Sequence, residues 1–195
     1  PQAEQAARRA LELDPQSAEA KTSMAMVYDR YYNDQQRATA LFEDILATNQ
    51  NHVVAYNLYA DSLLDTGEPR RAVEMQRSAV ELDPLSFFYR ARLAGRLVTN
   101  QRLEEAEKVL EGVLADDPGN GYAEEEMASL RRIQGRPAEA AGYLARVHAE
   151  RPGDPYSAAW LAIMGIEMGD DAMMTKLRDQ LEKPDKNHIR WKQLV

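Results

Sequence analysis

Small residues recur in this chain at a fixed step, and this regularity limits the possible folds more than any other feature. One alanine series has a spacing of 34 residues and comprises Ala60, Ala94, Ala128 and Ala162. A second alanine series and a proline series keep that step: Ala72, Ala106 and Ala140, and Pro84, Pro118 and Pro152. Several series in one frame indicate an internal repeat, and a period of this size is typical of a solenoid of helix pairs.

A glycine series marks a break inside each repeat. It comprises Gly67, Gly135 and Gly169, and Gln101 stands where a further glycine would complete the step. Glycine supplies the positive φ that ends many helices, and proline often occupies the first turn of the next helix. On both sides of these breaks the apolar residues are three or four positions apart, and the period-two pattern of a strand is absent. We therefore expect an all-α fold, with two helices in each repeat.

The prolines set the boundaries of the repeats, because proline disfavours helix for the residue before it. Pro15 and Pro84 are 69 residues apart, so one unit between them has one residue more than the step allows. We place this additional residue between the two helices of that unit, in residues 31–35. The predicted units are residues 18–52, 53–86, 87–120, 121–154 and 155–188.

The two ends match only parts of a unit. Residues 1–17 match the second half of a repeat, with Ala3 and Ala10 in the small-residue places. Such a helix buries its apolar face against a partner helix, so we expect that more chain precedes residue 1 in the full protein. We expect residues 189–195 to form a short helix that caps the array, and a hydrophobic dimer contact is the alternative. A monomer or weak homodimer is expected.

Composition excludes several classes of partner and site. A net charge of −8 argues against nucleic-acid binding through a basic surface. The chain has no cysteine, which excludes disulfides and thiolate metal sites and favours a reducing compartment such as the cytoplasm. No run of about 18 apolar residues is present, so no membrane span is predicted.

No pattern of catalytic or metal-binding residues is found. His52, His148 and His188 do not have the spacing of metal ligands, and a nucleophile motif of the Gly-x-Ser-x-Gly type is absent. The run of glutamates at residues 124–126 is typical of a solvated helix face. We therefore expect no enzyme activity, no metal and no cofactor.

These series together resemble the tetratricopeptide repeat (TPR) family, and the resemblance covers almost the whole chain. Unit 53–86 matches the family pattern with Tyr56, Tyr59, Ala60, Leu63, Gly67, Ala72, Gln76, Ala79 and Pro84. The last unit departs from it, with Gly165 at the usual aromatic place and Met174 in place of alanine. The resemblance implies a right-handed α-solenoid superhelix of about eleven antiparallel helices, followed by a short terminal helix.

The resemblance also implies a binding face. In the family, the first helices of the repeats line a concave groove that holds a segment of a partner protein. The residues that we predict at this groove are Asn57, Phe88, Arg92, Tyr122, Arg132 and Tyr156. As an alternative, the rings at positions 88, 122 and 156 only fill space between first helices. The Lys and Asn clamp of TPR domains that hold chaperone C-termini is absent.

The predicted function is a protein-interaction scaffold that binds a protein or peptide partner in this groove. One alternative is a regulatory or assembly domain of a larger enzyme or signalling protein. Another is a self-assembling structural array that stacks through its ends.

Overall fold

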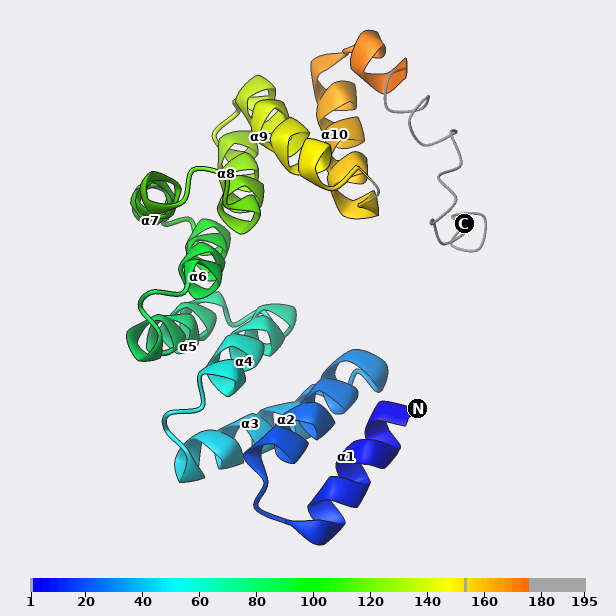
Figure 1. The fold of residues 1–195 in the computed structure, drawn as a ribbon, viewed down its shortest axis with the longest axis vertical. Helices are drawn as coiled ribbons and strands as arrows, with labels where there is room; N and C mark the ends of the chain where they lie inside the picture. Colours follow the sequence, from blue (N-terminus) through cyan, green and yellow to red (C-terminus); the bar gives the residue numbers. More distant parts are fainter. Residues whose placement is uncertain (1, 153, 176–195) are drawn as a thin grey trace. The chain divides into compact units, whose positions relative to one another are not determined.

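Helices follow one another along the chain (Figure 1), and consecutive helices pack together from α1 to α6 in the first unit and from α8 to α10 in the second. The computed structural model describes residues 2–152 and 154–175. Contacts divide the chain into two compact units, Pro1–Val109 and Leu110–Val195. The described residues contain helices and turns and no strand, which confirms the predicted all-α architecture of antiparallel helix pairs. The predicted cap at residues 189–195 lies outside the described residues.

The first unit starts with a single helix and continues with helix pairs. Its elements are α1 (Gln2–Leu13), α2 (Ala18–Met26), the π-helical turn η1 (Val27–Tyr31), α3 (Gln35–Thr48), α4 (Val53–Asp65), α5 (Pro69–Leu82) and α6 (Phe87–Thr99). Helix α7 (Leu103–Asp116) begins in the first unit and ends in the second. The second unit continues with α8 (Gly121–Ile133), α9 (Pro137–Glu150), α10 (Pro155–Met168) and the helical residues 171–175.

The alanine series lie at the contacts between helices. Ala60 and Ala72, on α4 and α5, are fully buried, and so is Ala38 on α3. Ala60 and Ala72 share one core with the stacked rings of Phe42 and Tyr59, whose centroids are 5.4 Å apart. In the second unit, Ala128 and Ala140 lie in a core with Leu144, Leu161 and Met164. A methyl side chain at these places lets two helix backbones approach closely, and this explains the regular step of the alanines.

The breaks between the paired helices use left-handed backbone at the same step. Five residues spaced by 34 have positive φ angles of 52° to 77°: Asn33, Gly67, Gln101, Gly135 and Gly169. Gln101 therefore adopts the conformation predicted for the missing glycine, with φ 58°. Pro69 and Pro137 open the following helices, as expected.

Polar side chains begin the first helix of every pair, a series that the sequence analysis did not identify. Each accepts a hydrogen bond from the backbone N–H three residues later: Ser17, His52, Ser86, Asn120 and Asp154. This capping satisfies an N–H that has no partner within the helix. Four of these residues keep the 34-residue step, and only Ser17 stands one residue further away.

The additional residue of the first complete pair lies inside its first helix, and the prediction that placed it in residues 31–35 is wrong. In the other four pairs, the capping residue and the residue with positive φ are 15 positions apart. In the first complete pair, Ser17 and Asn33 are 16 positions apart. The helix takes up the difference as the π-helical turn Val27–Tyr31. A π-helix holds one more residue per turn, so the turn beyond it keeps the register of the other repeats.

The unusual residues of the last repeat compensate for one another. Gly165 on α10 is buried, and a Cβ atom built on it would lie 2.9 Å from Sδ of Met174. Met173 packs against the same core as Leu161 and Met164. The family pattern has a large residue at the place of Gly165 and a small one at the place of Met174. Here the sizes are reversed, so the methionine fills the space that the glycine leaves.

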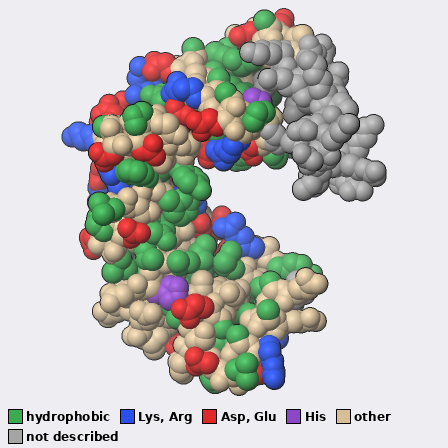
Figure 2. Space-filling view, in the orientation of Figure 1, with side chains coloured by type: hydrophobic (Ala, Val, Ile, Leu, Met, Phe, Trp, Pro, Cys, Tyr) green, Lys and Arg blue, Asp and Glu red, His purple; other side chains and the backbone are tan. Residues whose placement is uncertain are grey.

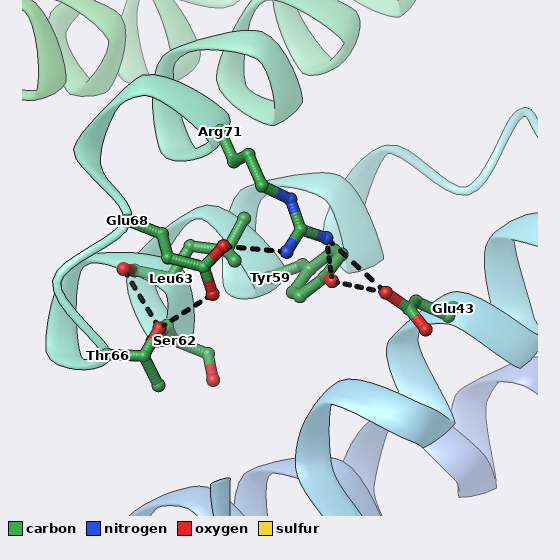
Figure 3. Close-up of polar contacts among 7 residues, drawn as sticks. All are labelled: Glu43, Tyr59, Ser62, Leu63, Thr66, Glu68 and Arg71. Carbon is green, nitrogen blue, oxygen red and sulfur yellow. Dashed lines mark hydrogen bonds and ion pairs between the residues drawn. The ribbon is translucent and has the colours of Figure 1, made fainter. Parts of the chain in front are cut away.

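A polar network joins three helices of the first unit (Figure 3). The Tyr59 hydroxyl donates to Oε1 of Glu43 at 2.9 Å and accepts from Nη2 of Arg71 at 2.7 Å. Arg71 also pairs with Glu68 at 2.8 Å. Burial of the Tyr59 hydroxyl, followed by its hydrogen bond to Glu43, raises the pKa of Tyr59 to about 12.

We expect Gln101→Gly to stabilise the protein by about 1 kcal/mol, because glycine adopts a positive φ without the steric cost of a side chain. The neighbouring Asn100 has a φ of −90°, so Asn100→Gly is the matched control and should give no gain. Urea unfolding of the three proteins measures the difference. Equal stability of wild type and Gln101→Gly would contradict the argument.

The Tyr59 network predicts a specific loss of stability in alkali. Because the folded-state pKa is raised above the usual value of 10, the contribution of Tyr59 is complete below pH 10 and is lost as the pH rises through about 12. Tyr59→Phe should cost about 1 kcal/mol at pH 8 from the missing hydrogen bonds. The difference in the free energy of unfolding between the wild type and Tyr59→Phe should then become smaller from pH 10 to pH 12. The control is Tyr122→Phe, at an exposed ring, and a gap that widens with pH would refute the prediction.

Candidate partner-binding surface

The six predicted groove residues all lie on first helices of repeats, three in each unit. Asn57 is on α4, Phe88 and Arg92 are on α6, Tyr122 and Arg132 are on α8, and Tyr156 is on α10. The surroundings of these residues differ between the two units. Those in the second unit include the two most exposed side chains of the set.

In the second unit, aromatic side chains and an arginine come together between α8 and α10. Tyr156 is 56% exposed and contacts Trp160, one turn further along α10, with ring centroids 6.2 Å apart. The guanidinium carbon of Arg132 lies 5.4 Å from the centroid of Trp160, and its Nη1 donates to Glu167 at 3.2 Å. Tyr122 on α8 is 49% exposed. The surface thus offers an exposed phenol ring next to Trp160 and an arginine that contacts Trp160 and Glu167, with a second exposed phenol ring at the start of α8.

Helix α10 is apolar on both sides. One side is buried and includes Ala158, Leu161 and Met164. The other side carries large apolar residues that remain exposed, among them Ile163 at 38% and Ile166 at 68%. A helix with apolar residues all round is typical of a position covered by other structure.

In the first unit, the predicted residues are partly occupied by internal contacts. Asp61 on α4 accepts hydrogen bonds from the guanidinium groups of Arg92 and Arg96, and Nη2 of Arg30 lies 3.7 Å from its carboxylate. The side chain of Arg96 is only 3% exposed. Asn57, one turn before Asp61, is buried, and its Oδ1 atom has no hydrogen-bond partner among the described residues. This cluster stabilises the contact between first helices.

Phe88 is half-buried on α6. Its ring meets that of Tyr89 edge to face, with centroids 5.3 Å apart. It therefore presents less free ring surface than the two tyrosines of the second unit.

Several residues of these surfaces were missed by the sequence analysis. Trp160 could have been found, because Tyr156 and Trp160 are four residues apart on one helix and so share a face. Arg92 and Arg96 show the same spacing. The pairing of Arg132 with Glu167 depends on how α8 packs beside α10 and leaves no signal in the sequence.

The histidines have structural roles where the structure describes them. Nδ1 of His52 caps α4, and Nδ1 of buried His148 lies 3.0 Å from the Ser157 hydroxyl. His188 lies outside the described residues. Among the residues that the structure describes, no three His, Cys, Asp or Glu side chains could together hold a metal ion.

One expectation about the glutamate run is wrong. Glu124 is buried at 2% exposure, and Arg146 of α9 pairs with its carboxylate, which offsets the cost of removing that charge from water. Glu125 pairs in the same way with Arg151. The run therefore joins α8 to the helix that follows it and does not form a solvated face.

A recess of about 570 Å³ lies between α1, α2 with η1, and α3 of the first unit. Its lining is mostly apolar, from Leu11, Met24, Tyr28, Ala40 and Leu41, with Arg8, Glu12 and Arg37 around it. Both arginines already form ion pairs, with Glu4 and Asp34.

The visible face of the molecule mixes acidic, basic and hydrophobic side chains (Figure 2). Among the described residues on this face, the Lys and Arg side chains do not form one broad patch. Within the described part of the chain, no helix has both the length and the apolar character needed to cross a membrane.

A model of the tetratricopeptide repeat family matches residues 53–84. This match falls on a unit that has the complete set of alanine, glycine and proline landmarks, and the helix pairs described above have the corresponding fold. This chain is a tetratricopeptide repeat protein.

Solved structures of other proteins share this fold, and two of the three that follow are described as TPR proteins. PilW, described as a widely conserved type IV pilus biogenesis factor, superposes with a TM-score of 0.73 at 17% identity, over 96% of this chain and 87% of PilW. A thermophilic TPR protein of Thermus thermophilus superposes with a TM-score of 0.71 at 21% identity, over 86% of this chain and 93% of that protein. YrrB, described as a TPR protein with an unusual peptide-binding site, superposes with a TM-score of 0.58 at 16% identity, over 94% of both chains. No curated protein matches the sequence.

The cluster around Asp61 predicts a stability effect on this TPR protein. Asp61→Ala should cost about 2–3 kcal/mol, because it removes a carboxylate from three guanidinium groups, one of them buried. Asp65→Ala changes an exposed carboxylate on the same helix and should cost less than about 0.5 kcal/mol. Urea unfolding measures the stability of both variants. Equal losses of stability would show that the Asp61 cluster contributes no more than an exposed carboxylate does.

Proposed function

We propose that this TPR protein is an interaction module that binds a segment of a partner protein on the exposed faces of its first helices. The observation that carries the proposal is the surface of the second unit, where exposed Tyr156 contacts Trp160, Trp160 lies against Arg132 of α8, and α8 carries a further exposed ring, Tyr122. Buried aromatic and arginine side chains are the commonest energetic centres of protein interfaces.

The arrangement suits a polypeptide ligand for physical reasons. Tyrosine rings bury a large area on binding and lose little rotamer entropy. Arg132 is held by Trp160 on one side and by Glu167 on another, so its remaining N–H groups point in defined directions. Such a guanidinium can donate to a backbone carbonyl or a carboxylate of the partner. Together these groups provide apolar anchors and a polar contact that sets orientation.

In the first unit the proposed contacts are Phe88 and Arg92, with a smaller share from Asn57. Arg92 is held by Asp61 in the free protein, so a partner would meet a positioned side chain. Asn57 is buried and presents little surface. The energetic centre of the proposed site is therefore in the second unit.

A different observation favours the alternative of assembly through the first helix. Ala3 and Ala6 on α1 are exposed, whereas Ala72, Ala106 and Ala140, which occupy the place of Ala3 in later repeats, are fully buried. The apolar face of α1 is suited to a further helix, from the same polypeptide or from another copy.

The test of the proposed function is a paired measurement on the full chain. A partner captured with the wild-type protein is purified, and its affinity is measured for Tyr122→Ala and Tyr156→Ala together with the melting temperature of each variant. We expect binding to weaken by about 10- to 100-fold with little change in melting temperature, because both rings are exposed.

Tyr31→Ala is the matched control, since that ring is 65% exposed and lies in the turn at the end of a first helix. It should leave affinity unchanged. Lower melting temperature with unchanged affinity for the Tyr122 and Tyr156 variants would assign these rings to packing.

A further inference from the structure

In the first unit, the second helices of successive repeats are joined by a glutamate and an arginine. Between α3 and α5, Oε1 of Glu43 lies 3.3 Å from Nη2 of Arg71, and both side chains contact the Tyr59 hydroxyl (Figure 3). Between α5 and α7, Arg77 pairs with Glu105. Each of these two junctions therefore has one carboxylate and one guanidinium that neutralise each other.

The recess between α1, α2 with η1, and α3 occupies the corresponding place one repeat earlier, but it has no such carboxylate. Three of its lining residues stand 34 or 35 positions before the members of the Tyr59 network: Arg8 before Glu43, Met24 before Tyr59, and Arg37 before Arg71. The step changes from 35 to 34 because the π-helical turn Val27–Tyr31 adds one residue between the second and third of these positions. An arginine thus stands at the place of the glutamate, and two arginines line the junction of α1 with α3.

The apolar part of the recess also differs from the next junction. Ala7 and Met24 stand 35 positions before Phe42 and Tyr59, whose stacked rings fill the core there. An alanine and a methionine fill less space than two rings, and this difference contributes to the volume of about 570 Å³. Small-molecule sites typically have volumes of about 300–1,000 Å³ and mostly apolar walls. Apolar side chains that line the recess pack on the core of Ala7 and Met24: Leu11, Tyr28 and Leu41.

Both arginines keep donors for a further carboxylate. A guanidinium has five N–H groups. Arg8 uses its Nε and Nη2 atoms for Glu4, and Arg37 uses its Nε atom for Asp34. The two arginine side chains are 58% and 60% exposed, so a ligand can reach them.

The other charged groups of the recess do not replace the missing carboxylate. Glu12 also lines the recess, and its carboxylate pairs with Arg9 at 2.7 Å. The guanidinium carbon of Arg37 lies 4.4 Å from the centroid of Tyr28, which holds the charge beside the apolar wall. A ligand with an apolar body and one carboxylate complements this combination of apolar walls and arginines.

We propose that the recess binds a small aliphatic carboxylate, of the chemical class of the medium-chain fatty acids. Its carboxylate pairs with Arg8 and Arg37, as the side chain of Glu43 pairs with Arg71 at the next junction. Its chain packs against Leu11 and Leu41. The site shares no residue with the surface proposed for a protein partner, so it does not depend on that function.

Protein-observed NMR on the full chain tests the site. Isotope-labelled protein is titrated at low ionic strength with octanoate, octanol and butanoate. We expect octanoate to shift the amide signals of residues 8–12, 24–28 and 37–41. Its affinity should exceed that of octanol about fivefold, because the alcohol lacks the charge that pairs with the arginines. Butanoate should bind at least about tenfold more weakly than octanoate, because it buries fewer methylene groups.

Arg8→Glu gives the chain its own carboxylate at the place that corresponds to Glu43. This variant should bind octanoate at least about tenfold more weakly and should bind octanol as the wild type does, which also shows that the recess is intact. The matched control is Arg70→Glu, at an exposed arginine of α5 in the same unit. It changes the net charge equally and should leave the affinity for octanoate within about twofold of the wild type.

Equal affinities of Arg8→Glu and Arg70→Glu for octanoate, or octanoate shifts confined to amides outside the recess, would overturn the proposal. A short peptide that ends in leucine, with a free or an amidated carboxyl end, is titrated in parallel. Shifts at the recess with the free peptide and none with octanoate would assign the site to a chain end and overturn the small-molecule class. None of these measurements needs a protein partner.

Discussion

Close approach of helices at alanine residues is the constraint on which the rest of this structure depends. Ala60, Ala72 and Ala38 have no exposed surface, and each stands where one helix meets another. A larger residue at such a place would separate the backbones and strain every contact around it. The regular step of the alanines thus follows from a single packing geometry, repeated from pair to pair.

Other positions of the repeat are less constrained, because a local change can keep the same register. The π-helical turn Val27–Tyr31 absorbs an additional residue before the left-handed Asn33. Gly165 and Met174 exchange large and small places, and the contact remains filled. Repeats tolerate such exchanges because each unit contacts only its neighbours, so a compensated change does not spread along the chain.

Charged side chains on the first helices serve two purposes that sequence alone does not separate. In the first unit, Arg92 and Arg96 neutralise Asp61, and the helices are joined by buried charge pairs. In the second unit, Arg132 bridges to Glu167 over Trp160, whose ring contacts the exposed Tyr156. An ion pair can fix a side chain for a partner as well as join two helices, and the exposed rings distinguish the second surface as the candidate site.

The sequence by itself determined the helix pairs, their alanine contacts and the places of the breaks between helices, because these features depend on local conformation and on periodic burial. It also predicted the first helices as carriers of the candidate site. Only the tertiary structure showed that Glu124 is buried against Arg146, that Asp61 gathers three arginines and that Trp160 lies beneath Arg132. Those pairings join residues from 22 to 35 positions apart, and they depend on the rotation of one helix against the next, which the repeat period does not encode.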